Sequence, residues 1–256
     1  MEDVTVIIQG KLLQDSYDFY IKNYTQCPVI ISTWIDTDID FKDIPSNFIV
    51  MLSPYPTEFG AQNINLQLIS TLNALKRVTT PLVIKMRGDE FWSNVQSIYD
   101  EIKMQQSKIH TSPIFFRAWD FTEYHISDHI IAGTKERLMV MFSQTKKNFD
   151  TGDMNISKWK LEGKFHRWVI THAPEERITK SYLSVIDPLR YEIVDGRILM
   201  KEYFSILDIK PLYPYRIKAN LFKTEWDGRE FIPEENFSIS TIEQLHSTEP
   251  YKIPNK

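Results

Sequence analysis

The feature that most constrains the fold of this 256-residue chain is a series of short apolar runs within its first 90 residues. The runs are rich in Val and Ile, and they lie at residues 4–10, 28–34, 47–53 and 81–90. Runs of this length are typical of strands buried in a parallel sheet. Helical patterns at 11–23 and 63–78 separate some of them, and strands that alternate with helices predict a parallel sheet. We therefore expect an α/β fold with a Rossmann-like, mostly parallel central sheet flanked by helices.

The fourth run, residues 81–90, begins apolar and ends abruptly in charge. Side chains alternate along a strand, so Lys85, Arg87 and Asp89 share one side if the strand continues that far. Ligands of open α/β sheets bind beyond the carboxyl ends of the strands. Cations there suit a phosphate, and a carboxylate suits a metal ion or a sugar hydroxyl. A strand that ends in a solvated, charged turn explains the same pattern, so the run alone leaves both readings open.

The rest of the chain is less regular. We expect three helices: one at 92–105, one from Thr134 as N-cap to about 142, and one that opens at 174–177. Strands are expected at 112–119 and 124–133. Residues 166–172 are expected to form a strand or a short helix. The Asp195-Gly196 pair lies between two apolar runs and predicts a hairpin within 193–204. Residues 146–160 are polar and are predicted as loop. Residues 212–231 are expected to cover the sheet as a small C-terminal extension, and 240–256 to form a weakly ordered tail.

Composition excludes several classes of protein. The net charge of −4 gives no electrostatic reason to expect a nucleic-acid partner. The single cysteine, Cys27, excludes a disulfide framework within the chain and a Cys-based zinc site. No GxGxxG follows the first run and no GxxxxGK[ST] occurs, which excludes the dinucleotide fingerprint and the P-loop. No apolar run approaches the roughly 18 residues of a membrane span, and the first residues lack a signal-peptide pattern. We expect a soluble, cytoplasmic protein.

Several short motifs follow one another in a fixed order between residues 4 and 185. They are Val6-Ile7-Ile8-Gln9-Gly10-Lys11, Ile31-Ser32-Thr33-Trp34, Asn63-x-Asn65-x-Gln67-x-x-Ser70-Thr71, Lys85-Met86-Arg87-Gly88-Asp89, Ser127-Asp128-His129 and Pro174-Glu175. The ordered set resembles the WavE-type lipopolysaccharide-synthesis family and related glycosyltransferase domains of some large DNA viruses. The resemblance implies a GT-A-like glycosyltransferase fold, a nucleotide-sugar donor (a UDP-sugar or another NDP-sugar) and a saccharide acceptor in polysaccharide synthesis.

The resemblance also implies the domain organisation. We expect one domain over residues 1–239, with a nucleotide-binding half to about residue 110 and an acceptor half over about 111–239, followed by the tail at 240–256. A glycosyltransferase of this kind holds a nucleoside diphosphate, neutralises it as it leaves, and places an acceptor hydroxyl near the anomeric carbon. Each of these tasks predicts particular residues.

Donor binding is predicted at the ends of the first, second and fourth strands and at the start of the second helix. Candidate residues are Gln9, Gly10, Lys11, Asp36, Asn63, Gln67, Lys85 and Arg87. The Gln9 amide suits a base edge, and Lys11 suits phosphate. Asp36, or Asp38, suits ribose hydroxyls, although acidic loop residues are often only solvated. Asn63 and Gln67 lie one helical turn apart. They either bind the nucleotide or fix the 85–89 segment, and capping and packing explain them equally well.

A metal ion is predicted at Asp89. The Arg87-Gly88-Asp89 segment lies where a GT-A enzyme has its Asp-x-Asp metal motif, and Arg replaces the first Asp. Asp89 can still bind Mn²⁺ or Mg²⁺, because these ions accept few protein carboxylates when phosphates fill the other positions. Glu90 is a reserve ligand. Alternatively, Arg87 and Lys85 neutralise the diphosphate without a metal ion.

Three residues are candidates for the catalytic base. An inverting transfer needs a carboxylate that deprotonates the acceptor hydroxyl, and Asp128 is the first candidate. His129 competes with it, although a lone His more often serves structure or a metal ion. Glu175 is the third, with helix capping as its alternative role. Trp34, Trp92 and Trp119 either stack on sugar faces or belong to the core.

Three rival functions remain open. A sugar-nucleotidylyltransferase needs a Gly-rich loop after the first strand, and Gly10-Lys11-Leu12-Leu13 lacks it. A non-catalytic nucleotide- or saccharide-binding module derived from a transferase fits the Arg at the metal motif, but it would release no diphosphate. A structural or interaction protein would gain no thermal stability from nucleotides.

Overall fold

A computed structural model describes residues 1–92, 94–112 and 126–152, together with the short stretches 178–179, 182, 192–194, 197–199, 203–207 and 214–216. Seven strands of the described residues form one sheet in the order β10-β6-β7-β4-β1-β2-β3. Their bounds are β1 Val4–Gln9, β2 Val29–Trp34, β3 Phe48–Ser53, β4 Leu82–Arg87, β6 Ile109–Thr111, β7 Ile130–Thr134 and β10 Phe204–Ile206. The predicted α/β class is confirmed.

The four strands that lie side by side at one end of this sheet, β4, β1, β2 and β3, are parallel. β7 runs antiparallel to both β4 and β6. From β1 the chain moves outward to β2 and β3 and then returns to place β4 on the other side of β1. The strand order therefore reverses between β1 and β4, the kind of position at which open α/β sheets bind their ligands.

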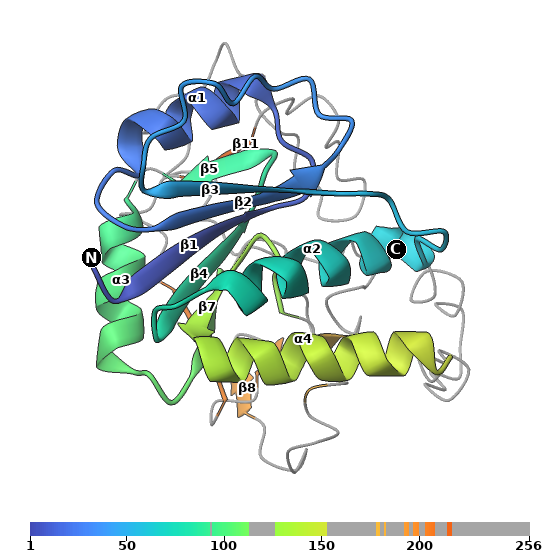
Figure 1. Cartoon of the computed structure of the whole chain (residues 1–256). Coiled ribbons are helices and arrows are strands. Elements are labelled where there is room, and N and C mark those ends of the chain that lie inside the picture. Colours follow the sequence, from blue (N-terminus) through green and yellow to red (C-terminus); the bar gives the residue numbers. More distant parts are fainter. Residues whose placement is uncertain are drawn as a thin grey trace, which may run out of the picture.

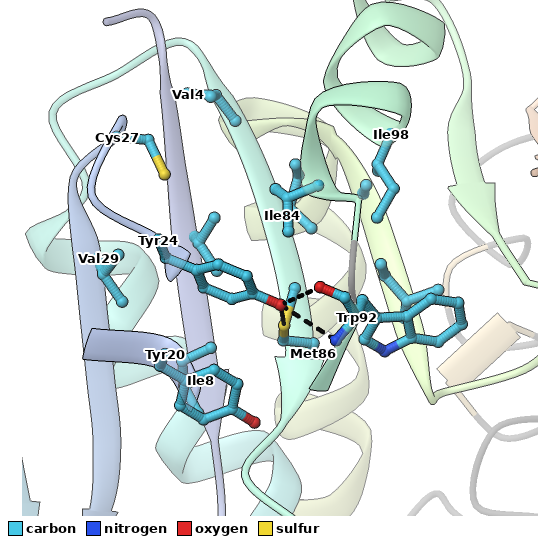
Figure 2. Packing of buried hydrophobic residues seen from close by; sticks show 14 of the residues in the cluster. Val4, Ile8, Tyr20, Tyr24, Cys27, Val29, Ile84, Met86, Trp92 and Ile98 are labelled. Atoms are coloured by element: carbon cyan, nitrogen blue, oxygen red, sulfur yellow. Dashed lines mark hydrogen bonds between the residues drawn. The ribbon is translucent and has the colours of Figure 1, made fainter. Parts of the chain in front are cut away.

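Helices cover both faces of the sheet (Figure 1). α1 (Gln14–Asn23) and α3 (Val95–Met104) contribute to one apolar cluster, and α2 (Ile64–Arg77) and α4 (Lys135–Asp150) contribute to the other. Tyr20, Tyr24, Met86 and Trp92 fill the first cluster, and Figure 2 shows their side chains packed together. Side-chain alternation along the buried strands explains why one sheet has two apolar faces.

Two small antiparallel pairs complete the described strands. β5 (Glu90–Trp92) pairs with β11 (Pro214–Arg216), and β8 (Glu192–Val194) pairs with β9 (Arg197–Leu199). The second pair confirms the hairpin predicted around Asp195-Gly196. None of the helices in these described ranges has the length and apolar character needed to cross a lipid bilayer.

Several predicted boundaries are wrong. α1 begins at Gln14 rather than at 11, because Gly10 has a φ of +92° and Leu13 is extended. Residues 90–92 form a strand, and α3 begins only after Asn94, whose side chain accepts a hydrogen bond from Ser97 N. The strand was predicted at 112–119, but β6 ends at Thr111 and Ser112 is not part of it; residues 113–119 lie outside the described residues.

The C-terminal end of α4 was also predicted wrongly. Thr134 does cap this helix as predicted, with its hydroxyl accepting a hydrogen bond from Arg137 N. The helix, however, continues to Asp150 instead of ending near 142, supported by side-chain pairs four residues apart such as Gln144–Asn148. Polarity at 146–150 marked an exposed helical end and not a loop. The predicted elements at 166–172 and 174–177 lie outside the described residues.

Candidate functional site

The turn after β4 brings the charged end of the central strand into one place. β4 ends at Arg87, and the chain turns at Gly88 and Asp89 before β5 begins. Gly88 N donates to Gln9 O at 2.8 Å, and a Cβ atom on Gly88 would lie only 2.6 Å from Lys11 O. Glycine is therefore required where the end of β1 meets this turn. The turn folds Asp89 back beside Arg87, so the strand alternation expected through residue 89 stops two residues earlier.

α1 holds the backbone of this turn from the opposite face of the sheet. The Ser16 hydroxyl donates to Gly88 O at 2.6 Å. The Tyr20 hydroxyl donates to Arg87 O at 3.0 Å and also lies against Glu90 O. Both side chains are buried, so the main chain of residues 87–90 is fixed independently of the side chains that it presents.

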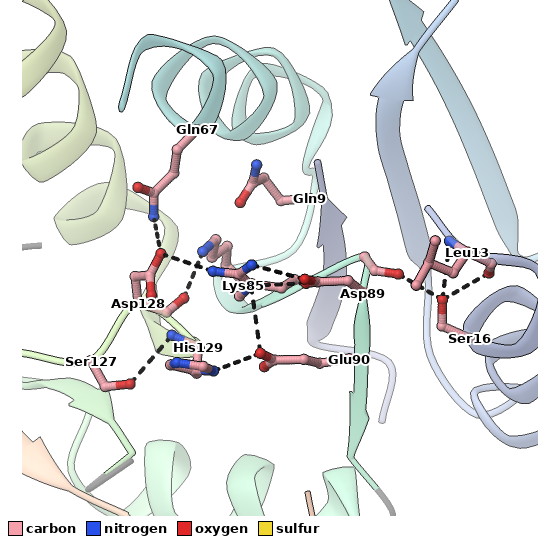
Figure 3. A network of polar contacts seen from close by, with 12 residues as sticks. Gln9, Leu13, Ser16, Gln67, Lys85, Asp89, Glu90, Ser127, Asp128 and His129 are labelled. Carbon is pink, nitrogen blue, oxygen red and sulfur yellow. Dashed lines mark hydrogen bonds and ion pairs between the residues drawn. The ribbon is translucent and has the colours of Figure 1, made fainter. Parts of the chain in front are cut away.

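Arg87 lies at the centre of a group of carboxylates. The three carboxylates are those of Asp89, Glu90 and Asp128, which Figure 3 labels. The Nε and Nη2 atoms of Arg87 each donate to one oxygen of Asp89 at 2.8 Å, the bidentate geometry that guanidinium groups favour. Nε also lies 3.5 Å from Glu90 Oε1, and Nη1 lies 3.8 Å from Asp128 Oδ2. Burial alone would lower the pKa of Arg87, but these three carboxylates outweigh it and hold the pKa well above its ordinary value.

Lys85 is placed differently, although it shares the strand face with Arg87. Its side chain is 0% exposed, and Nζ donates to the backbone carbonyl of Asp128 at 2.8 Å. Asp128 lies two residues before β7, and β7 pairs antiparallel with β4. The buried ammonium thereby ties the loop before β7 to the central strand.

The loop that carries Asp128 is held from three directions. Gln67, on α2, donates from Nε2 to Asp128 Oδ2 at 3.2 Å. On β6, the Thr111 hydroxyl donates to Ser127 O at 2.7 Å. Together with Lys85 these bonds fix a buried carboxylate at the same sheet edge as Arg87. We call Lys85, Arg87, Asp89, Glu90, Asp128 and His129 the Arg87 cluster.

Another acidic residue of the cluster, Glu90, is paired with His129. Glu90 Oε1 lies 2.6 Å from His129 Nδ1, and both side chains are buried. The sequence indicated Glu90 only as a reserve metal ligand and did not pair it with His129, 39 residues away. The sequence signal for this pair was that charged or titratable residues lie beside two separate apolar runs. It could not show that Glu90 and His129 meet, because that contact depends on β7 lying beside β4.

With this geometry in place, the chain can be compared with known proteins. The model of the family described as WavE lipopolysaccharide synthesis matches residues 11–183. The chain belongs to this family. The matched range contains every member of the Arg87 cluster. The comparison with curated proteins finds no match.

Several solved structures are similar at low sequence identity. Mouse xyloside xylosyltransferase 1, in its apo form, is 9% identical with a TM-score of 0.44, over 82% of this chain and 86% of that chain. A putative glucose-1-phosphate thymidylyltransferase from Bacillus anthracis, in complex with a sucrose, is 10% identical with a TM-score of 0.43, over 83% and 88%. The galactosyltransferase LgtC, in complex with donor and acceptor sugar analogs, is 9% identical with a TM-score of 0.41, over 70% of each chain.

In this WavE-family chain, the predicted donor-binding residues fall into two groups. Gln67, Lys85 and Arg87 meet in or beside the Arg87 cluster. Gln9 lies on the same sheet face and is buried, with Nε2 donating to the Ser70 hydroxyl of α2 at 2.9 Å. The Nε2 group of Gln9 is therefore already bonded within the fold, and its role in donor binding stays a prediction.

The other predicted donor-binding residues lie around this edge and contact the cluster in no described hydrogen bond or ion pair. Gly10 follows β1, and Lys11 after it is exposed. Asp36 is also exposed, and burial together with a hydrogen bond to Asp36 raises the pKa of Tyr55. Asn63 is exposed in a left-handed conformation and makes no side-chain cap bond, whereas Gln67 is buried. Their roles in donor binding stay predictions.

The remaining candidates have clear positions or fall outside the structure. Trp92 is fully buried in the core. Trp34 is also buried, and its ring stacks on that of Tyr55 with centroids 4.7 Å apart. Glu175 and Trp119 lie outside the described residues. Of the three predicted bases, the structure therefore brings Asp128 and His129 together.

The residues around Asp89 do not fit a divalent metal ion as they are arranged. Both carboxylate oxygens of Asp89 accept hydrogen bonds from Arg87, so an ion bound there would lie beside a guanidinium of like charge. Within the described ranges, no three His, Cys, Asp or Glu side chains are grouped so that they could hold a metal ion. The Mn²⁺ or Mg²⁺ ion predicted at Asp89 stays a prediction.

Proposed function

We propose that this protein is a glycosyltransferase that moves a sugar from a nucleoside-diphosphate donor to a saccharide acceptor. One observation carries the proposal: a partly exposed guanidinium and a buried, firmly held carboxylate lie 3.8 Å apart where the strand order reverses. A guanidinium suits the diphosphate of the donor, and a carboxylate suits an acceptor hydroxyl. Membership of a lipopolysaccharide-synthesis family supports carbohydrate as the substrate class.

The transfer would proceed as a substitution at the anomeric carbon of the donor sugar. The oxygen of an acceptor hydroxyl attacks this carbon, and its proton passes to the carboxylate of Asp128. The bond between the anomeric carbon and the diphosphate oxygen breaks, and its electron pair remains on the diphosphate. Arg87 would stabilise the negative charge that develops there, which is the usual way in which such sites accelerate transfer. Written in this way, the reaction inverts the anomeric centre.

Gln67 and Lys85 would act as positioning residues in this scheme. Gln67 donates to the side chain of Asp128 and Lys85 donates to its backbone carbonyl, so both restrict where the carboxylate lies. A base has to lie within hydrogen-bond reach of the proton that it accepts. The predicted alternative base, His129, is oriented by Glu90 at 2.6 Å and is buried beside Asp128.

A two-step experiment tests this function. Thermal unfolding is first measured with a panel of nucleoside diphosphates and nucleotide-sugars, and we expect one base to raise the melting temperature. The release of nucleoside diphosphate from the responsive donor is then measured with saccharide acceptors. Stabilisation followed by release supports the transferase. Stabilisation without release in any acceptor mixture would instead identify a binding module, and the absence of any response to nucleotides would contradict both.

A further inference from the structure

The two cations at the end of β4 differ in whether a ligand can reach them. The Lys85 side chain is 0% exposed and donates to a backbone carbonyl, whereas the Arg87 side chain is 30% exposed. The Asp89 side chain beside Arg87 is 23% exposed. A diphosphate that approaches this edge from solvent therefore meets the pair formed by Arg87 and Asp89 before it meets Lys85.

The contact between Arg87 and Asp89 uses the donor geometry that a phosphate would use. Nε and Nη2 point at two oxygens of one group, each at 2.8 Å. Carboxylate and phosphate groups both offer paired oxygens that match this guanidinium fork. Asp89 thus holds the place on Arg87 that fits a phosphate group best, and a phosphate can bind there only after the carboxylate has moved.

The main chain that carries the pair is held by groups other than the Asp89 side chain. Ser16 and Tyr20, on α1, donate to the carbonyls of Gly88 and Arg87, so these bonds do not depend on which group occupies the guanidinium of Arg87. Glu90 at 3.5 Å and Asp128 at 3.8 Å remain near the guanidinium and keep it oriented. Arg87 would therefore remain in position when its bidentate partner is exchanged.

We propose that Asp89 is a resident counter-ion that the donor diphosphate displaces from Arg87, so that Arg87 takes the place of a divalent metal ion in this site. The inference rests on the proposed function and adds how the diphosphate is neutralised. It gives Asp89 the opposite role from that of a metal ligand. A metal ligand strengthens diphosphate binding, whereas a resident counter-ion competes with it.

The sign of one affinity change separates these two roles. The dissociation constants of UDP, GDP, CDP and inorganic pyrophosphate are measured by calorimetry, in EDTA and in MnCl₂, for the wild type and for Asp89→Asn. We expect Asp89→Asn to bind the responsive ligand about two- to fivefold more tightly in EDTA, the range for loss of a competing, partly exposed ion pair. We also expect wild-type affinity to be no higher in MnCl₂ than in EDTA, because free Mn²⁺ binds the diphosphate oxygens in solution and an arginine site gains nothing from it.

Further variants make the result specific. Arg87→Met should weaken binding by at least about thirtyfold, because a charged partner of the phosphate is lost. Asp40→Asn is the matched control, because Asp40 pairs with Lys42 at the same spacing of two residues but at the exposed surface, at 2.9 Å. It should leave every affinity unchanged. Damage to the fold would weaken binding, so tighter binding by Asp89→Asn cannot arise from a purely structural defect.

Two results would overturn the inference, and they differ from failure of the proposed function. Weaker binding by Asp89→Asn, together with Mn²⁺-dependent binding by the wild type, would make Asp89 a metal ligand within a functioning donor site. Unchanged binding by Arg87→Met would place the diphosphate elsewhere. If the wild type binds neither the nucleotides nor pyrophosphate under either condition, the donor site itself is contradicted and the inference falls with it.

Discussion

At the carboxyl end of β4 the two faces of the strand carry opposite chemistry, although they come from alternating residues. Leu82, Ile84 and Met86 enter the apolar cluster beneath α1 and α3 (Figure 2). Lys85 and Arg87 face the side covered by α2, where the charged cluster gathers. Figure 3 shows Lys85 there with Gln67 and Asp128. Val83 adds apolar packing to the second face nearer the start of the strand, and only its end supplies groups that can act on a ligand.

The comparison also shows that the apolar face positions the polar one. Two hydroxyls in the apolar cluster, those of Tyr20 and Tyr24, bond to the backbone of residues 87–92. The Tyr24 hydroxyl donates to Trp92 O at 2.8 Å and accepts from Trp92 N at 3.1 Å. The Tyr20 hydroxyl donates to Arg87 O. The main chain of residues 87–92 is thus fixed from one side while its charged side chains are presented on the other.

Met86→Ala should have the largest effect on stability and should test the separation of the two faces. Met86 is 0% exposed, and its removal leaves a cavity in the apolar cluster. We expect the free energy of unfolding to fall by about 2–5 kcal/mol, measured by urea denaturation. Nucleotide affinity below the unfolding transition should stay within about twofold, in contrast to Arg87→Met. A large loss of affinity in Met86→Ala would mean that the two faces are not separable.

The buried thiol of Cys27 predicts a pH dependence that belongs to the apolar face alone. Burial raises the pKa of Cys27 from 9.0 to about 11. The unfolded chain therefore loses this proton first, so the stability is fully present below pH 9 and falls as the pH rises towards 11. The loss is about 2 kcal/mol at pH 11. Urea denaturation of the wild type and Cys27→Ala at pH 8–11 measures it. If the free energy of unfolding fell equally with pH in the two proteins, the pH dependence could not be assigned to Cys27.

Tyr20→Phe should have the smallest effect and should sharpen the link between the faces. The change removes the hydroxyl that holds Arg87 O and leaves the ring in place. We expect a loss of about 1–3 kcal/mol in the free energy of unfolding, because a buried carbonyl loses its partner. Nucleotide affinity should also fall by a few fold, because the turn is less well fixed. Unchanged affinity would show that α1 does not position the Arg87 cluster.

Much of the fold could be predicted from the sequence because strong local patterns determine it. β1, β2, β3 and α2 lie within one or two residues of their predicted bounds. Boundaries failed where tertiary contacts decide: α1 starts late because Gly10 and Leu13 are not helical, and residues 90–92 become a strand by pairing with β11. Neither effect leaves a periodic signal in the chain.

The candidate site could be predicted in part. Residue types at strand ends indicated Arg87 and Asp128, and the structure brings them to 3.8 Å. The sequence did not reveal that Lys85 is buried, that Glu90 pairs with His129, or that Asp89 folds back onto Arg87. These contacts depend on the turn at Gly88 and on β7 pairing antiparallel with β4, which are long-range features of the fold.

Whether Asp128 is the base of the transfer is decided by the release of nucleoside diphosphate from Asp128→Asn, with donor affinity determined in the same preparation. We expect a loss of release of about 100-fold or more and an affinity within a few fold of the wild type, because a general base contributes to the reaction and not to binding of the diphosphate. Asp100→Asn, at an exposed carboxylate on α3 that accepts only from Gln96 in the described hydrogen bonds, should behave as the wild type. Normal release by Asp128→Asn would contradict Asp128 as the base and, with it, the proposed transfer at this sheet edge.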